Sequence, residues 1–133
     1  MPDATISNVS DSGPTDAPRR FALLAALFGF VAVIVSESIV EGGVNSWTSI
    51  PTWAVFAAVA SLATLAPWMP GLSPAARAAA WRAAAVGVAS LWFVWVLFVL
   101  PGIHRNVAFV FTLGIAASSW AVWSAPGRSP PAS

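Results

Sequence analysis

The chain has 133 residues, of which 58% are hydrophobic and 8% are charged, and its formal net charge is +1. A soluble domain has about a quarter of its residues charged, so this composition argues strongly against a soluble globular protein. The small net charge and the lack of a basic stripe argue against nucleic-acid binding. The chain has no cysteine and one histidine, which excludes disulfides, thiolate chemistry and a multi-histidine metal site within one chain.

The first segment, residues 1–18, is rich in Ser, Asp, Pro and Thr. Such a segment cannot bury enough apolar surface to offset the entropy lost on ordering, so we expect a disordered cytoplasmic tail. The basic pair Arg19-Arg20 follows the tail, and no cleavage site ends the next apolar run. These two features argue against a signal peptide.

Four apolar stretches follow the tail. About twenty apolar residues cross a hydrocarbon core of about 30 Å as a helix, and stretches of about eighteen fall within the usual range. A soluble bundle would show a polar stripe every three to four residues, but residues 83–100 contain Ser90 as their one polar side chain. We therefore predict an all-α, polytopic membrane protein with a four-helix transmembrane domain over residues 19–125. Its helices are expected at about 21–41, 52–69, 76–100 and 104–124.

The placement of arginine and tryptophan predicts the orientation of these helices. Four crossings put five of the six arginines on one side, namely Arg19, Arg20, Arg77, Arg82 and Arg128. The positive-inside rule then places both termini in the cytoplasm, including a short tail at 126–133. Six of the eight tryptophans agree, because they fall near the predicted interfaces: Trp47 and Trp53 near the outer one, and Trp68, Trp81, Trp120 and Trp123 near the inner one. Richness in Ala, Arg and Trp without Lys is typical of a high-GC genome, so we expect the bacterial cytoplasmic (inner) membrane.

A short motif recurs after the second and fourth predicted helices. Residues 70–74 read PGLSP and residues 126–130 read PGRSP, fifty-six positions later. A tandem pair of helical hairpins would produce this recurrence, and parallel repeats occur in membrane transporters. The alternative is that Pro, Gly and Ser simply dominate short loops.

Glu37 is an ionisable residue inside the first predicted helix, which makes it a candidate functional group. It lies about 25 Å beyond Arg20 at 1.5 Å per residue, which places it near the outer interface. One interpretation is a polar helix end, with Glu41 one turn further on, that fixes the depth of the helix. A second is an ion pair with Arg105 or with an arginine of a partner subunit. The third is a proton-coupling carboxylate.

His104 and Arg105 form the predicted outer turn between the third and fourth helices. One axial histidine is enough to bind haem or a chlorin, so His104 is a candidate cofactor ligand. The alternative is a solvated turn histidine, because no recognisable cofactor motif surrounds it. For Arg105 we expect contact with a glutamate at the same depth. We expect no metal and no resident cofactor. We do expect contacts with lipids.

Small residues recur every four positions on two predicted helices, at Ala79, Ala83 and Gly87 and at Gly114 and Ser118. Small-xxx-small faces allow helix backbones to approach closely in lipid, so we interpret these residues as packing surfaces. A high alanine content produces the same spacing by chance, which is the alternative interpretation.

No catalytic arrangement is evident, because the chain lacks Tyr, Lys and Cys and has no Gly-rich phosphate loop. We therefore expect a protein that is not an enzyme. The leading hypothesis is a non-catalytic accessory or structural subunit of a larger bacterial membrane complex, in contact with other integral membrane subunits and lipids. The first alternative is a small homo-oligomeric transporter or channel with Glu37 as its coupling carboxylate. The second is a helper that binds haem, a pigment or quinone.

Overall fold

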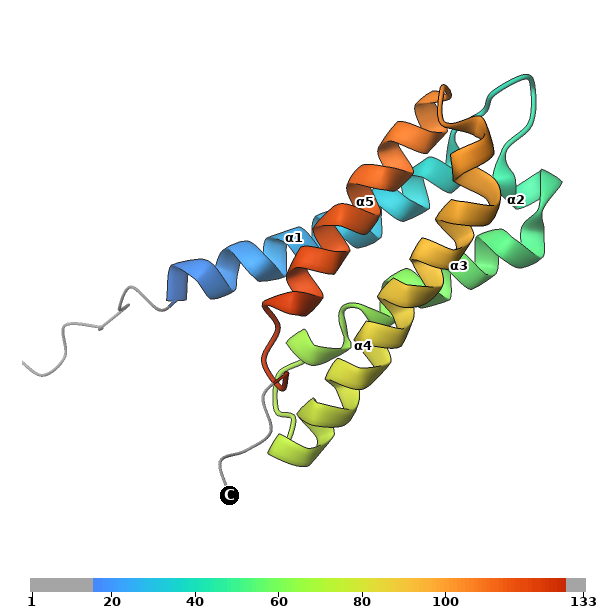
Figure 1. The fold of residues 1–133 in the computed structure, drawn as a ribbon. Helices are drawn as coiled ribbons and strands as arrows, with labels where there is room; N and C mark the ends of the chain where they lie inside the picture. Colours follow the sequence, from blue (N-terminus) through green and yellow to red (C-terminus); the bar gives the residue numbers. More distant parts are fainter. Residues whose placement is uncertain (1–15, 129–133) are drawn as a thin grey trace, which may run out of the picture.

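The computed structural model describes residues 16–128, which form a bundle of long helices (Figure 1). The long helices are α1 (Asp16–Ser38), α3 (Pro51–Ala63), α4 (Pro74–Val94) and α5 (Asn106–Trp123). Short elements join or extend them: α2 (Ser46–Ser49), the 3₁₀ turns η1 (Ala66–Trp68) and η3 (Leu100–Gly102), and the π-helix η2 (Trp95–Val99). No strand occurs among the described residues.

Four segments of this fold are long and apolar enough to cross a membrane. They are Asp16–Ser38, Pro51–Trp68, Pro74–Gly102 and Asn106–Trp123. The predicted class, an all-α polytopic membrane protein with four transmembrane helices, is therefore confirmed.

The helix ends differ from the predicted ones by a few residues. Helix α1 begins at Asp16, inside the predicted tail 1–18, because an acidic side chain and Pro18 both suit a first helical turn. It ends at Ser38, so Glu41 lies beyond the helix. Residues 1–15 of the predicted tail, and 129–133 of the tail predicted at 126–133, lie outside the described residues.

Two prolines explain why the second and third spans are not uniform α-helices. Proline lacks an N–H donor and clashes with the preceding turn. Helix α3 ends at Ala63, and η1 continues the span around Pro67. Helix α4 passes into the π-helix η2 and then into η3, which contains Pro101. A π-helix widens one turn, so it changes which side chains face the bundle there.

The helices run antiparallel to their chain neighbours, which gives the bundle two distinct ends (Figure 1). The α2 end comprises residues 38–50 and 99–108, where α2 and the turn before α5 lie. The arginine end comprises the starts of α1 and α4 and the end of α5. Five arginines lie toward it: Arg19, Arg20, Arg77, Arg82 and Arg128.

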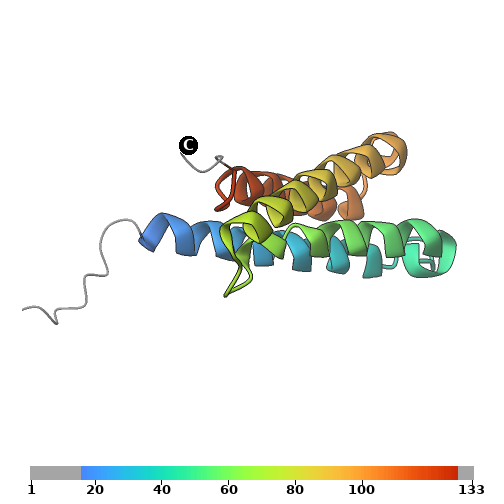
Figure 2. The ribbon, with the colours of Figure 1, turned by 90° about the horizontal axis from the view of Figure 1, so that it is seen from below.

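The helices are arranged as a ring in the order α1, α5, α4, α3. Helix α1 packs mainly on α5, and α3 packs mainly on α4, while α1–α3 and α4–α5 contacts close the ring. Figure 2 shows α1 and α3 in one layer and α4 and α5 in the other. The chain thus forms two consecutive hairpins, the first of α1 and α3 and the second of α4 and α5. The most extensive helix contacts are made between the two hairpins and not within either of them.

Glycines allow the closest contacts between these two layers. A Cβ atom on Gly29 of α1 would collide with Ser118 Oγ of α5 and lie 2.9 Å from the Gly114 carbonyl oxygen. A Cβ atom on Gly87 of α4 would lie 2.5 Å from the carbonyl oxygen of Ala60 in α3. Both main contacts of the ring thus depend on a glycine at the point of closest approach.

The pattern of burial repeats with an offset of 58 residues. The four buried residues of α4 each match a buried residue of α1: Ala26 and Ala84, Gly29 and Gly87, Val33 and Leu91, Ser36 and Val94. The same offset relates the second helix of each hairpin and the residues just after it: Ala57 and Ile115, Ala60 and Ser118, Thr64 and Val122, Pro67 and Ala125.

The two glycine contacts obey the same offset. Gly29 meets Ser118, and Gly87 meets Ala60, and each residue of one pair lies 58 positions from its counterpart in the other. Two tandem hairpins with the same pattern of buried residues produce this correspondence. The structure thus supports the predicted pair of hairpins on evidence independent of the recurring loop motif.

Candidate functional site

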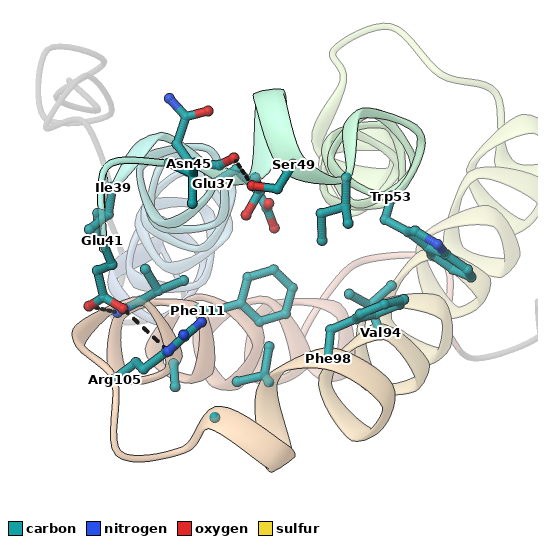
Figure 3. Close-up of a pocket in the computed structure, with 17 residues that line it drawn as sticks. Glu37, Ile39, Glu41, Asn45, Ser49, Trp53, Val94, Phe98, Arg105 and Phe111 are labelled. Carbon is teal, nitrogen blue, oxygen red and sulfur yellow. Dashed lines mark hydrogen bonds and ion pairs between the residues drawn. The ribbon is translucent and has the colours of Figure 1, made fainter.

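A cavity of about 330 Å³ lies at the α2 end, between α1, α2, α3, the π-helix η2 and α5 (Figure 3). It reaches the molecular surface there, because Val44, Ser49 and Arg105 in its lining are exposed. Its inner wall is closed by Val94, Ala108 and Phe111, all of them buried. The volume falls in the range of sites that bind small organic molecules.

Glu37 supplies a carboxylate to this cavity from the last turn of α1. Its side chain is 6% exposed, and Figure 3 shows it pointing toward the cavity. Ser46 at the start of α2 lines the same cavity. A carboxylate in such a place is costly unless a cation or a proton accompanies it.

Helix α2 is short, but its cap fixes the position of Ser46. The Asn45 side chain accepts a hydrogen bond from the Thr48 backbone N–H at 3.1 Å, and the Thr48 hydroxyl lies 3.4 Å from the Asn45 backbone N–H. This reciprocal pair is a capping box, which satisfies donors at the helix start. The spacing Asn45-x-x-Thr48 is visible in the sequence and signals this helix.

Glu41 has a structural task at the rim of the cavity. Its Oε1 accepts hydrogen bonds from the backbone N–H groups of Asn106, at 3.0 Å, and Val107, at 3.4 Å. It thereby caps α5, whose N-cap residue Arg105 makes no side-chain cap of its own. Gly42 and Gly43, both with positive φ, form the tight turn that follows Glu41.

The predicted contact of Arg105 with a glutamate is made to Glu41 and not to Glu37. Arg105 Nε lies 3.9 Å from Glu41 Oε2, and the Arg105 side chain is largely exposed. It is the one ion pair among residues 16–128. Glu37 therefore has no cationic side chain of the described chain as its partner.

Aromatic side chains line the rest of the cavity. The rings of Trp53 and Phe98 lie 4.8 Å apart between centroids and are tilted by 52°. Phe111, which is 1% exposed, closes the inner wall. From the sequence Trp53 is expected at the membrane interface, and neither Phe98 nor Phe111 stands out as a site residue. Their convergence depends on the ring order of the helices and on the π-helix η2, neither of which hydropathy reveals.

The other predicted site residues lie outside the cavity. His104 is exposed in the turn before α5. Ala79 and Ala83 are exposed on α4, whereas Gly87 faces α3. Gly114 and Ser118 are buried between α5 and α1. The small residues of α5 therefore serve contacts within the chain, and those of α4 are divided between an inner and an outer face.

Residues 16–128 contain no cluster of three or more His, Asp or Glu side chains able to hold a metal ion. A scan of the chain against models of known protein families found no match, and searches of curated proteins and of solved structures found none either.

Proposed function

We propose that the protein is a small multi-pass transporter of the bacterial cytoplasmic membrane that admits a cationic solute to the cavity at the α2 end. Glu37 is its coupling carboxylate. The observation that carries this proposal is the burial of Glu37 beside a cavity, without a cationic side chain of the described residues to neutralise it. An ionisable group in a membrane segment marks an ion or substrate pathway.

The orientation follows from the arginines. Five of them lie toward the arginine end, and the positive-inside rule places that end in the cytoplasm. The cavity then faces the outside, and Glu37 exchanges its proton or its cation with the external solution. Partners in this proposal are lipids and further copies of the chain.

The internal repeat supports a transport function, because many transporters move one half against the other around a site between them. Here the cavity lies where the two hairpins meet at the α2 end. Below it, the hairpins make their closest contacts at Gly29 and Gly87.

The test is cation-dependent proton movement in proteoliposomes. Purified protein is reconstituted with a pH-sensitive dye inside, and Na⁺, K⁺, tetramethylammonium or benzyltrimethylammonium is added outside. We expect at least one of these cations to change the internal pH with the wild-type protein. Glu37→Gln should reduce the rate to that of protein-free vesicles, because an amide carries neither proton nor charge.

Two controls make the result interpretable. Glu41→Gln, which keeps an acceptor for α5, should retain most of the rate, and size-exclusion chromatography should show both variants folded. Equal rates for the wild type, Glu37→Gln and protein-free vesicles would rule out a transporter coupled through Glu37.

The accessory subunit is the second candidate, favoured by the outer face of α4. Ala79 and Ala83 are exposed there, and Val86, one turn further on, is 66% exposed. A helix face that carries small side chains permits another membrane helix to pack closely. No comparable observation favours the haem, pigment or quinone helper, because His104 lies outside the cavity.

Mass spectrometry after purification in mild detergent tests the subunit function. We expect a stoichiometric membrane partner to co-purify with the wild type, and Ala83→Leu to lose it because the added side chain prevents close approach. Leu113→Ile, a change on the exposed face of α5, is the matched control. A wild-type protein that elutes without any partner argues against this candidate.

A further inference from the structure

The cavity has the wrong chemistry for a bare divalent metal ion. A water molecule takes up about 30 Å³, so a cavity of about 330 Å³ holds roughly ten such volumes. Calcium and magnesium prefer six or more oxygen ligands. Two carboxylates line the cavity, and the described residues hold no group of three or more acidic or imidazole side chains.

Of the two carboxylates in the cavity lining, Glu41 is paired with Arg105 and Glu37 is not paired with a cationic side chain of residues 16–128. Glu41 is occupied by two backbone N–H groups of α5 and lies 3.9 Å from Arg105. Glu37 lines the cavity together with Ser46 and is 6% exposed. A proton on Glu37 or a single positive charge on a ligand would compensate this carboxylate, because a buried charge is stable when it is paired.

The walls of the cavity favour a ligand with an apolar, flat body. Trp53 and Phe98 form a tilted aromatic pair with centroids 4.8 Å apart, and Phe56 meets Trp53 edge-on. Val94 and Phe111 complete the inner surface. Aromatic faces attract organic cations, and they add apolar contact that a hydrated metal ion does not use.

We propose that the cavity binds a lipophilic organic monocation, such as a quaternary ammonium ion with an aromatic substituent. The cationic head lies at Glu37, and the apolar body lies against Trp53, Phe98 and Phe111. This assignment names the substrate class of the proposed transporter and rests on that function for its physiological meaning. Its test, however, measures binding and needs no transport.

The test is equilibrium binding of tritiated benzyltrimethylammonium to the protein in lipid nanodiscs, with empty nanodiscs subtracted. We expect saturable binding with one site per chain. Glu37→Gln should weaken it about thirtyfold, as expected when one partner of a buried charge pair is lost. Trp53→Leu, which keeps the carboxylate, should weaken it about fivefold through the lost aromatic face. Trp123→Leu, an exposed position at the arginine end, should leave the affinity unchanged.

Competition with unlabelled compounds defines the ligand class. Neopentylbenzene has the same shape without the charge, and tetramethylammonium has the charge without the aromatic body. Both should compete at least about tenfold less well than unlabelled benzyltrimethylammonium. Equal competition by neopentylbenzene, or wild-type affinity in both Glu37→Gln and Trp53→Leu, overturns the assignment.

The binding and transport experiments fail in distinguishable ways. Glu37-dependent binding without any cation-driven pH change refutes the transporter and leaves the ligand class intact. A Glu37-dependent pH change driven by Na⁺ or K⁺, without binding of benzyltrimethylammonium, supports the transporter and refutes the organic cation.

Discussion

Gly29→Val is expected to destabilise the bundle by about 3 kcal/mol, at the upper end of the range for overpacked sites. A single Cβ at this position already meets Ser118 Oγ, and it lies 2.9 Å from two backbone atoms of α5, the Gly114 oxygen and the Ser118 nitrogen. Backbone atoms cannot rotate away as a flexible side chain does. Helices α1 and α5 must therefore separate along their main contact.

Thermal unfolding in detergent, followed by circular dichroism at the helix band, measures this effect. Ala83→Val adds bulk to an exposed position of α4 and should change the stability by no more than about 0.5 kcal/mol. Ser118→Ala should be nearly neutral alone, because Ser118 Oγ is buried without a hydrogen-bond partner. A Gly29→Val protein as stable as the wild type would contradict the close contact of α1 with α5.

Phe111→Ala is expected to destabilise the protein by about 3 kcal/mol, because it empties the best-packed aromatic position of the core. Phe111 is 1% exposed and packs in one cluster with Val33, Leu91 and Ile115. The loss comes from dispersion contacts with neighbours that cannot collapse fully into the gap. The same substitution also enlarges the cavity at its inner wall.

Phe109 provides a matched control on the same helix. It is 65% exposed, so Phe109→Ala removes the same ring where it faces away from the core and should cost no more than about 0.5 kcal/mol. Both variants are compared with the wild type by thermal unfolding in the same detergent. Equal losses for Phe109→Ala and Phe111→Ala would show that the core does not lie on the Phe111 side of α5.

The four spans could be predicted from the sequence because crossing a bilayer constrains the length and the composition of a helix. Both properties can be read directly from the sequence. Which face of each helix is buried could not be predicted in the same way. In a soluble bundle polar residues mark the outer face, but here both faces are apolar, as Phe109 and Phe111 on α5 illustrate. Small residues indicate close packing but do not indicate which helix packs against them. The sequence therefore did not distinguish Gly114, which is buried against α1, from Ala83, which is exposed.

The candidate site was predicted in part. Glu37 was identified because a carboxylate in an apolar segment stands out. The division of roles between Glu37 and Glu41 depends on the turn at Gly42-Gly43, which directs one carboxylate to α5 and leaves the other in the cavity. The aromatic wall depends on contacts between residues more than forty positions apart, such as Trp53 and Phe98. Sequence periodicity carries no information on such pairs.

The 58-residue repeat bears on how many equivalent carboxylates the cavity contains. The position equivalent to Glu37 in the second hairpin is Trp95, whose indole N–H donates to Thr112 Oγ1 at 2.8 Å. An unmodified repeat would offer an equivalent carboxylate in each hairpin and two equivalent ways for a ligand to lie. With a carboxylate in one hairpin and a hydrogen-bonded indole in the other, the two halves are not equivalent, so the cation of the proposed function would have a single orientation.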